Sequence, residues 1–495
     1  MAKLSLARNT SLNLLGFGVP LLAALLVVPA LVVRLGLAKF GFLALAWALV
    51  GYFSLFDLGI GRLLTRSVAE AKAESNQVQL RALCKSGLTI AGALGIVTGM
   101  LLFVGADWLC ASLIRLPANL VVEGAAALRV LALCVPFVTL TAALRGMLEG
   151  GQHFASVNLI RLSLGVFTFA GPAMVVVLVT TDLTFLAWVL VGLRCIFAAA
   201  HWWVAARAMP QLVGFGWPDA GPLKAMISYG LWITASNIVG PIIVYADRFM
   251  LAGLAGVAAV GLYAAPYEII TKAWLFPAAI SSSLFPVFAT SARDATIAVY
   301  AFSIKAIVLI VGPLAVAGAL LAPEWLGLWL GQAFAQETAA ATRILCLGIL
   351  SNCIAYIPLA LLQAKGRPDL PAKIHLALLP AYVIALAVAV GAWGIAGAAL
   401  VWAVRNLLDA VALCACCVRA GHVAWPKAKL PLSLVGVLLL AGGIASVCIS
   451  DIGFKWIFLF AYIPLFALTC WRFVLDGDER EWIRVRMKPA LAGVR

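Results

Sequence analysis

Basic side chains inside long apolar runs are the residues of this sequence whose chemistry is easiest to interpret. Arg194 lies in the middle of WVLVGLRCIFAAAHWWV (188–204), with no acidic residue within two helical turns. A guanidinium does not lose its proton, so it needs water, an anion or a distant acid as partner. Two interpretations stay open: contact with an anionic ligand in a cavity, or a structural pair between helices.

Further basic residues in apolar surroundings extend this candidate set. Lys272 follows Glu268 by four residues, and Arg405 precedes Asp409 by four, which is the spacing of ion pairs on a helix. Each pair either neutralises itself or contributes its cation to a ligand. The predicted ligand contacts, in order of preference, are Arg194, Lys272, Arg405, Arg34 and Arg129.

An adjacent acid and base stand at the end of another apolar run. The stretch YADRFMLAG (245–253) places Asp247 beside Arg248. One interpretation is a hydrated pair that ends a helix and sets its depth. The other is a gate that closes the outer mouth of a cavity near Arg34.

Composition indicates the elements that must position these side chains. The 495 residues are 64% hydrophobic and 11% charged, whereas a soluble protein has about 25% charged residues. Uncharged runs of 18 or more residues recur without the alternation of barrel strands, so they predict transmembrane helices. The fold class is therefore an all-α polytopic membrane protein.

Fourteen spans are predicted from these runs. They cover residues 10–33, 40–61, 86–107, 125–146, 158–180, 183–206, 226–246, 257–286, 302–322, 338–362, 372–391, 394–417, 431–450 and 454–472. Glycine and proline are expected to interrupt three of them: Gly16, Gly18 and Pro20 in the first, Gly240 and Pro241 in the seventh, and Pro266 and Pro277 in the eighth.

Lysine and arginine set the expected orientation. They are concentrated in the loops on the side of the N-terminus and in the tail, which places both termini in the cytoplasm. Because the net charge of +15 is spread over short loops, it indicates topology and anionic membrane lipids rather than nucleic acid. The eleven cysteines lie mostly within spans and are expected to be buried thiols, without a metal site.

An internal repeat organises the spans. The loop LEGGQHFASVNLIRL (148–162) resembles LQAKGRPDLPAKIHL (362–376), at an offset of six spans, so the two halves have parallel topology. The predicted domains are an N-lobe at 1–206, a C-lobe at 207–417, and two further helices with a basic tail at 418–495. None of the loops is long enough for a soluble catalytic domain, so the protein is not expected to be an enzyme.

Stretches spread over residues 9 to 406 resemble the polysaccharide-transport (oligosaccharide repeat-unit) flippases. This family shares a superfamily with the multidrug-and-toxin extruders and the lipid II flippase. The resembling stretches are NTSLNLLGFGVP (9–20), FDLGIGRLLTRSVAE (56–70), RGMLEGGQHFASVNLIR (145–161), YADRFMLAG (245–253), YAAPYEIITKAW (263–274), FPVFAT (285–290), WLGLWLG (325–331), LLQAKGRPDLPAK (361–373) and GIAGAALVWAVRN (394–406).

The resemblance implies two six-helix lobes around a cavity, in the bacterial inner membrane. The implied activity moves an undecaprenyl-diphosphate-linked oligosaccharide to the periplasmic leaflet by alternating access, for O-antigen, capsule or exopolysaccharide synthesis. No cofactor is expected beyond a coupling ion, H⁺ or Na⁺. Expected partners are membrane lipids and the polysaccharide polymerase and chain-length machinery. The alternatives are an ion-coupled multidrug exporter of the same fold, a membrane polysaccharide polymerase or ligase, and an assembly subunit without transport of its own.

Overall fold

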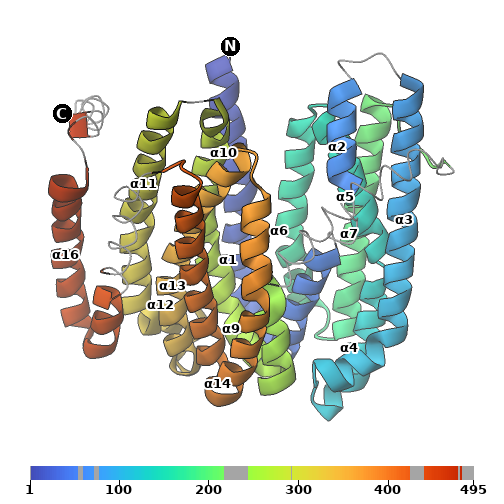
Figure 1. Ribbon diagram of the computed structural model, residues 1–495. Helices are drawn as coiled ribbons and strands as arrows, with labels where there is room; N and C mark the ends of the chain where they lie inside the picture. The colour runs from blue at the N-terminus through green and yellow to red at the C-terminus, as the bar shows by residue number, and fades with distance from the viewer. Residues whose placement is uncertain are drawn as a thin grey trace, which may run out of the picture. The chain divides into compact units, whose positions relative to one another are not determined.

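Helices joined by short turns make up the computed structural model in the residues that it describes, which are 2–53, 60–71, 77–216, 243–290, 292–423, 437, 440–475, 477 and 480–481 (Figure 1). Two compact units are formed, Met1–Ala265 with Leu386–Ile395, and Pro266–Ala385 with Ala396–Arg495. We call them unit 1 and unit 2 and describe each by itself. The lobe and tail boundaries expected from the sequence stay a prediction.

Unit 1 is built from long helices and ends within α9. Its elements are α1 (Ala2–Phe53), α2 (Ile60–Ala71), α3 (Gln77–Trp108), the π-helical turn η1 (Leu109–Leu113), α4 (Ala118–Ala132), α5 (Val135–Gly150), α6 (Phe154–Leu178), α7 (Leu183–Ala208), a helix over residues 243–255, and α9 (Val257–Ile270).

Unit 2 continues from the end of α9. Its elements are the 3₁₀ turn η2 (Thr271–Trp274), α10 (Leu275–Thr290), α11 (Arg293–Leu320), α12 (Ala322–Leu330), α13 (Gln332–Ala364), α14 (Asp369–Arg419, with residues 386–395 in unit 1), α16 (Ile452–Thr469) and the π-helical turn η3 (Cys470–Val474).

The predicted membrane spans correspond to these helices. Nine helices of the described part are long and apolar enough to cross a membrane. Two of them, α1 and α14, each contain two predicted spans, joined where Gly36 (φ 74°) and Gly394 (φ 54°) leave the helical conformation. The seventh predicted span falls mostly outside the described residues, and the thirteenth falls partly outside them. The chain is an all-α polytopic membrane protein, as expected.

Expected interruptions of the spans are found in one case and not in another. The eighth span is broken, because η2 separates α9 from α10 between Pro266 and Pro277. Since Pro277 has no N–H, the carbonyl of Ala273 lacks its helical donor, and it accepts a weak contact from Cys353 Sγ at 3.8 Å. The expected break at Gly16, Gly18 and Pro20 is wrong, since α1 stays helical up to Gly36. Gly240 and Pro241 lie outside the described residues.

The two loops of the predicted internal repeat have the same backbone turn. After α5, Gln152 N donates to Glu149 O (3.0 Å) and His153 N to Leu148 O (2.9 Å). After α13, residues 366 and 367 make the equivalent bonds to residues 363 and 362, at 3.1 and 2.8 Å. Gln152 (φ 65°) and Gly366 (φ 73°) occupy the same left-handed position of a helix C-cap. All of these positions are related by one offset of 214 residues.

Two glycines allow a close helix crossing inside unit 1. A Cβ on Gly41 would lie 1.9 Å from Val257 O, and a Cβ on Gly261 would lie 2.6 Å from Leu37 O. Both glycines therefore let the backbones of α1 and α9 touch, which is how small residues act in membrane helix packing. Gly41 comes five residues after Gly36, and Gly261 comes five residues after Gly256; both of the earlier glycines have a positive φ.

Within unit 2, an ion pair holds the C-terminal helix α16 against α12. Lys455 is 2% exposed, and its Nζ lies 2.7 Å from Glu324 Oε1 of α12. Leu459 packs nearby against Leu320 of α11. The remaining surface of α16 exposes large apolar side chains such as Phe460, which suits a helix facing lipid.

Candidate substrate and gate residues

Arg194 lies on the face of α7 that packs into unit 1. The helix begins at Leu183 because Asp182 caps it, accepting a hydrogen bond from Phe185 N at 2.8 Å. Leu190 and Ala198, one turn before and after Arg194, are buried, and the helix packs against α4 and α5. Within the described part of the chain, no carboxylate lies within ion-pair distance of Arg194. The guanidinium thus sits mid-span on an interior face without an acid.

A break between α4 and α5 lies next to this arginine. Cys134, the residue before α5, is near enough to Arg194 to interact with it electrostatically. Pro136 has no N–H, so the carbonyl of Ala132 loses its helical hydrogen bond at this point. The break therefore leaves a carbonyl without its helical donor two residues from Cys134.

The other two basic residues predicted in unit 1 have different surroundings. Arg34 is exposed, two residues before the bend at Gly36. Arg129 forms an ion pair with Asp107 of α3, and both side chains are substantially exposed. The sequence did not indicate this partner, because the two residues are 22 positions apart on separate helices.

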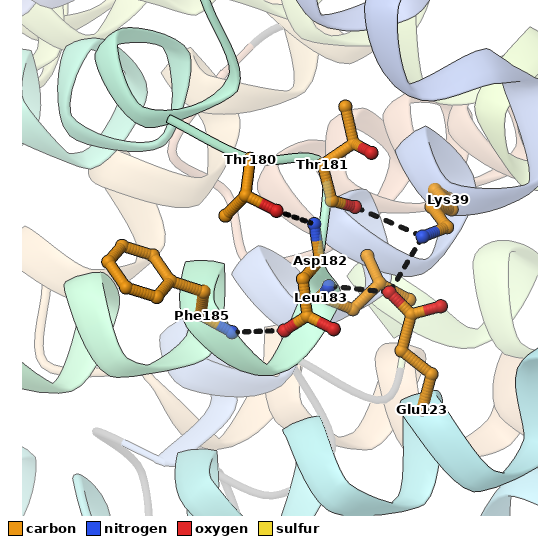
Figure 2. Close-up of polar contacts among 7 residues, drawn as sticks. All are labelled: Lys39, Glu123, Thr180, Thr181, Asp182, Leu183 and Phe185. Carbon is orange, nitrogen blue, oxygen red and sulfur yellow. Dashed lines mark hydrogen bonds and ion pairs between the residues drawn. The ribbon is translucent and has the colours of Figure 1, made fainter. Parts of the chain in front are cut away.

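A lysine–glutamate cluster, which the sequence analysis missed, joins three helices of unit 1 (Figure 2). Lys39 Nζ lies 2.7 Å from Glu123 Oε1 of α4 and donates to Thr181 O at 3.0 Å. The same Glu123 oxygen accepts from Leu183 N, the first residue of α7, at 2.7 Å. We call Lys39, Glu123, Thr181 and Leu183 the lysine–glutamate cluster. In the sequence, the only indication of this cluster is that Glu123 is a lone acid in the apolar run of α4.

Asp247 and Arg248 are buried rather than hydrated. Their exposed fractions are 0% and 3%, and the helix that carries them continues to residue 255. Asp247 accepts hydrogen bonds from Tyr263 Oη of α9 at 2.8 Å and from Arg248 N at 2.7 Å. The Arg248 guanidinium lies over the Tyr245 ring, 5.4 Å from its centroid. The interpretation as a hydrated pair that ends the helix is therefore wrong, because the pair joins two packed helices; the gate role stays a prediction.

In unit 2, both ion pairs expected at four-residue spacing are present. Lys272 lies in the 3₁₀ turn η2, and Glu268 lies just before this turn. Lys272 Nζ is 3.2 Å from Glu268 Oε2. Arg405 NH2 lies 3.7 Å from Asp409 Oδ2 on α14. Local helix geometry was sufficient to predict these two contacts.

Three more polar residues, which were not predicted from the sequence, surround Arg405 and Asp409. His375, from the first half of α14, brings its Nε2 to 3.1 Å from Asp409 Oδ1. Asn406 Oδ1 accepts from Arg405 NH1 at 3.0 Å and from Asn352 Nδ2 of α13 at 2.9 Å. We call these five residues the histidine–aspartate cluster. An ionisable cluster inside membrane helices is a candidate functional site.

Metal-binding clusters of three or more His, Cys, Asp or Glu side chains do not occur among the described residues. The cysteines of the described part are all free thiols, and most are buried. They pack as small apolar residues with occasional weak contacts, such as Tyr300 Oη to Cys414 Sγ at 3.3 Å.

Comparison with known proteins assigns the family. Residues 6–292 match the family described as "Polysaccharide biosynthesis protein". The chain belongs to this polysaccharide biosynthesis protein family. A relative described as "Putative O-antigen transporter", from Shigella flexneri, is 29% identical over 418 residues, which is 83% of this chain and 97% of the relative.

Solved structures with the same fold support the architecture of this family member. A lipid II flippase MurJ aligns with a TM-score of 0.74 and 10% identity, covering 95% of this chain and 100% of that one. A multidrug resistance MATE family transporter aligns with a TM-score of 0.64 and 13% identity, covering 86% and 99%. At these identities the likeness shows the fold alone.

Proposed function

We propose that the protein is a flippase for undecaprenyl-diphosphate-linked oligosaccharide repeat units. It moves them from the cytoplasmic to the periplasmic leaflet of the bacterial inner membrane by alternating access, and both of its termini are cytoplasmic. The family and the relative described as an O-antigen transporter support this choice of substrate class. The product serves O-antigen, capsule or exopolysaccharide synthesis, so the polymerase and chain-length machinery are expected partners.

The observation that carries the proposal is the mid-span guanidinium of Arg194. A charge at this depth costs roughly 2.5–3.5 kcal/mol on insertion scales, and no carboxylate of the described residues offsets it. A diphosphate supplies two or more charged oxygens that a guanidinium binds with paired hydrogen bonds. A cationic drug would instead call for an acid at this place.

The remaining residues have defined parts in this proposal. Arg194 binds the diphosphate first, while Lys272 and Arg405 contribute cations that their own carboxylates partly neutralise. Arg34 and Arg129 contact the group at the expected outer side, and Asp247 with Arg248 holds the outer gate. No covalent bond is broken in the transport, so the protein acts as a transporter and not as an enzyme.

Reconstituted transport tests the proposal. Purified protein in liposomes receives an undecaprenyl-diphosphate-linked oligosaccharide with a fluorescent sugar, and a membrane-impermeant quencher reports the leaflet. We expect Arg194→Ala to slow transfer about tenfold, the equivalent of one lost charge-assisted hydrogen bond. Arg194→Lys should retain part of the rate, because it keeps the charge but not the paired geometry.

The matched control is Arg207→Ala on the same helix. Arg207 stacks on Trp203, 4.3 Å from the ring centroid, near the end of α7, and its loss should leave the rate within twofold. Full transport by both Arg194 variants would contradict the binding role of this residue. Gradient-driven efflux of cationic dyes without transfer of the lipid-linked sugar would reject the flippase, and product formation from lipid-linked units would establish an enzyme.

A further inference from the structure

The histidine–aspartate cluster of unit 2 is a buried polar network in a helix that is otherwise apolar. Asn406 is 0% and Asp409 5% exposed. The His375 side chain is 24% exposed, and that of Arg405 is 12% exposed. Solvent exposure therefore decreases across the cluster, from the His375 imidazole to the enclosed Asp409 carboxylate.

Hydrogen bonds within this cluster are incomplete. Asp409 Oδ1 is fully enclosed and has no hydrogen-bond partner among the described residues, although His375 Nε2 lies only 3.1 Å away. Arg405 Nε and Asn406 Nδ2 are likewise enclosed without partners in the described part. Buried polar atoms of native proteins are nearly all hydrogen-bonded, so an exception of this kind calls for a functional explanation.

The geometry favours a proton as the species that completes the network. Asp409 Oδ1 is enclosed, so a group larger than a proton reaches it only if the helices separate. Arg405 already provides a fixed positive charge beside Oδ2, which weakens the attraction of the carboxylate for a metal cation. A proton on His375 Nε2 needs no further space, and it creates a donor 3.1 Å from the oxygen that lacks one.

Among the described residues, few charged groups lie around this pair. From α14 itself, Arg405 approaches Asp409, while Asp369 is paired with Arg367 and Lys373.

The helices packed against α14 add little to this set of charges. From α13 the cluster receives Asn352, which does not titrate. From α9, Tyr267 contacts Trp402, and the adjacent Glu268 is paired with Lys272. From α11, which contacts α14 at Cys414, the buried charge is Lys305.

We propose that His375 and Asp409 form a proton-binding site, with His375 as the group that binds the proton and Asp409 as the carboxylate that stabilises the imidazolium. His375 Nε2 accepts a proton from water, and the imidazolium N–H then donates to Asp409 Oδ1. The cluster gains one positive charge, and Asp409 shares its negative charge between His375 and Arg405. Arg405 is thereby released in part for an anionic group. Resting on the proposed function, this makes H⁺ rather than Na⁺ the coupling ion of transport.

A spectroscopic experiment tests the site without any transport. The chain has four histidines, so histidine-selective ¹⁵N labelling of the full-length protein in lipid nanodiscs gives a simple spectrum, and His375→Gln assigns the His375 signal. In the wild type, the imidazolium signal of His375 should show an Nε2–H that is hydrogen-bonded to a carboxylate, and Asp409→Asn should remove this bond. Identical His375 signals in both proteins, or no imidazolium signal for His375, would overturn the site.

A gradient experiment tests the coupling. In liposomes containing fluorescent lipid-linked oligosaccharide, a pH gradient of one unit represents a tenfold ratio of proton activity, and we expect it to stimulate wild-type transfer by up to tenfold. His375→Gln and Asp409→Asn should both lose the stimulation. The control His422→Gln should behave like the wild type. Stimulation by a Na⁺ gradient, or full pH stimulation in both variants, would refute the assignment.

The two experiments separate the failure of this site from the failure of the proposed function. If the wild type does not move lipid-linked oligosaccharide at all, the flippase proposal fails. The histidine spectrum of wild type against Asp409→Asn then still decides whether the pair binds a proton.

Discussion

The lysine–glutamate cluster of unit 1 and the histidine–aspartate cluster of unit 2 both place an acid against a base between membrane helices. In unit 1, one Glu123 oxygen receives hydrogen bonds from Lys39 and from Leu183 N, each at 2.7 Å. In unit 2, Asp409 Oδ1 receives none from the described residues, and the contact of Asp409 with Arg405 is 3.7 Å long. The first network is satisfied, and the second is not.

This difference indicates how a buried polar group is used. A satisfied network is rigid, and removing one member leaves the others unpaired inside the protein. In an incomplete network some polar groups are already buried without hydrogen bonds, so removing a member changes the free energy of unfolding less. We therefore expect the unit 1 cluster to matter mainly for stability and the unit 2 cluster mainly for transport.

The largest expected effect is that of Glu123→Leu. It leaves the ammonium of Lys39 and the N–H of Leu183 without their carboxylate, which should lower the free energy of unfolding by about 2–4 kcal/mol. Thermal unfolding of the detergent-purified protein measures this. In the double variant Lys39→Met/Glu123→Leu much of the loss should return, because no charge is left unpaired. A single variant as stable as the wild type would remove the contrast between the two clusters.

A smaller effect on stability is expected for Asp409→Asn. The amide keeps the shape of the side chain and replaces an oxygen without a hydrogen bond by a group of similar size, so unfolding should change by about 1 kcal/mol or less. The same unfolding assay applies, with Glu123→Gln as the matched substitution in unit 1. If Asp409→Asn were the more destabilising of the two, the aspartate would be the structural acid.

The smallest expected effect concerns His422, beyond the end of α14. Partial burial, followed by the positive charges of Lys365, Arg367 and Arg293, holds the pKa of His422 below its ordinary value. The unfolded chain therefore binds this proton more readily, and stability falls as the pH drops below about 6.5. When unfolding is measured at pH 7.5 and 5.5, His422→Gln should lack the part of the decrease in stability that His422 causes. An unchanged pH dependence would show that other groups cause the loss.

Local spacing predicted much of the fold and the ion pairs within a helix. Apolar runs were enough for the spans, and four-residue spacing was enough for Glu268–Lys272 and Arg405–Asp409. The loop resemblance at an offset of 214 residues correctly indicated a shared turn, because a helix C-cap leaves a mark in a short stretch of sequence.

Contacts between distant helices were not predictable in the same way. Lys39 and Glu123 are 84 residues apart, and they meet because α1 bends at Gly36. His375 and Asp409 lie on the two halves of α14, and they meet because the helix reverses near Gly394. The sequence suggests a bend at such glycines but not its direction. The burial of Asp247 likewise depended on Tyr263 from the following helix.

The glycine crossing in unit 1 has the form of a dimer contact within one chain. Gly41 of α1 faces the backbone of Val257 in α9, and Gly261 of α9 faces the backbone of Leu37 in α1. The two helices thus make the same contact in both directions. Such reciprocity is the signature of an isologous interface between identical subunits. Gly36-Leu-Ala-Lys-Phe-Gly41 and Gly256-Val-Ala-Ala-Val-Gly261 still share the pattern, but Lys39 has Ala259 as its counterpart. The backbones of the crossing are thus alike on its two sides, whereas the charge that joins the lysine–glutamate cluster is present on one side only.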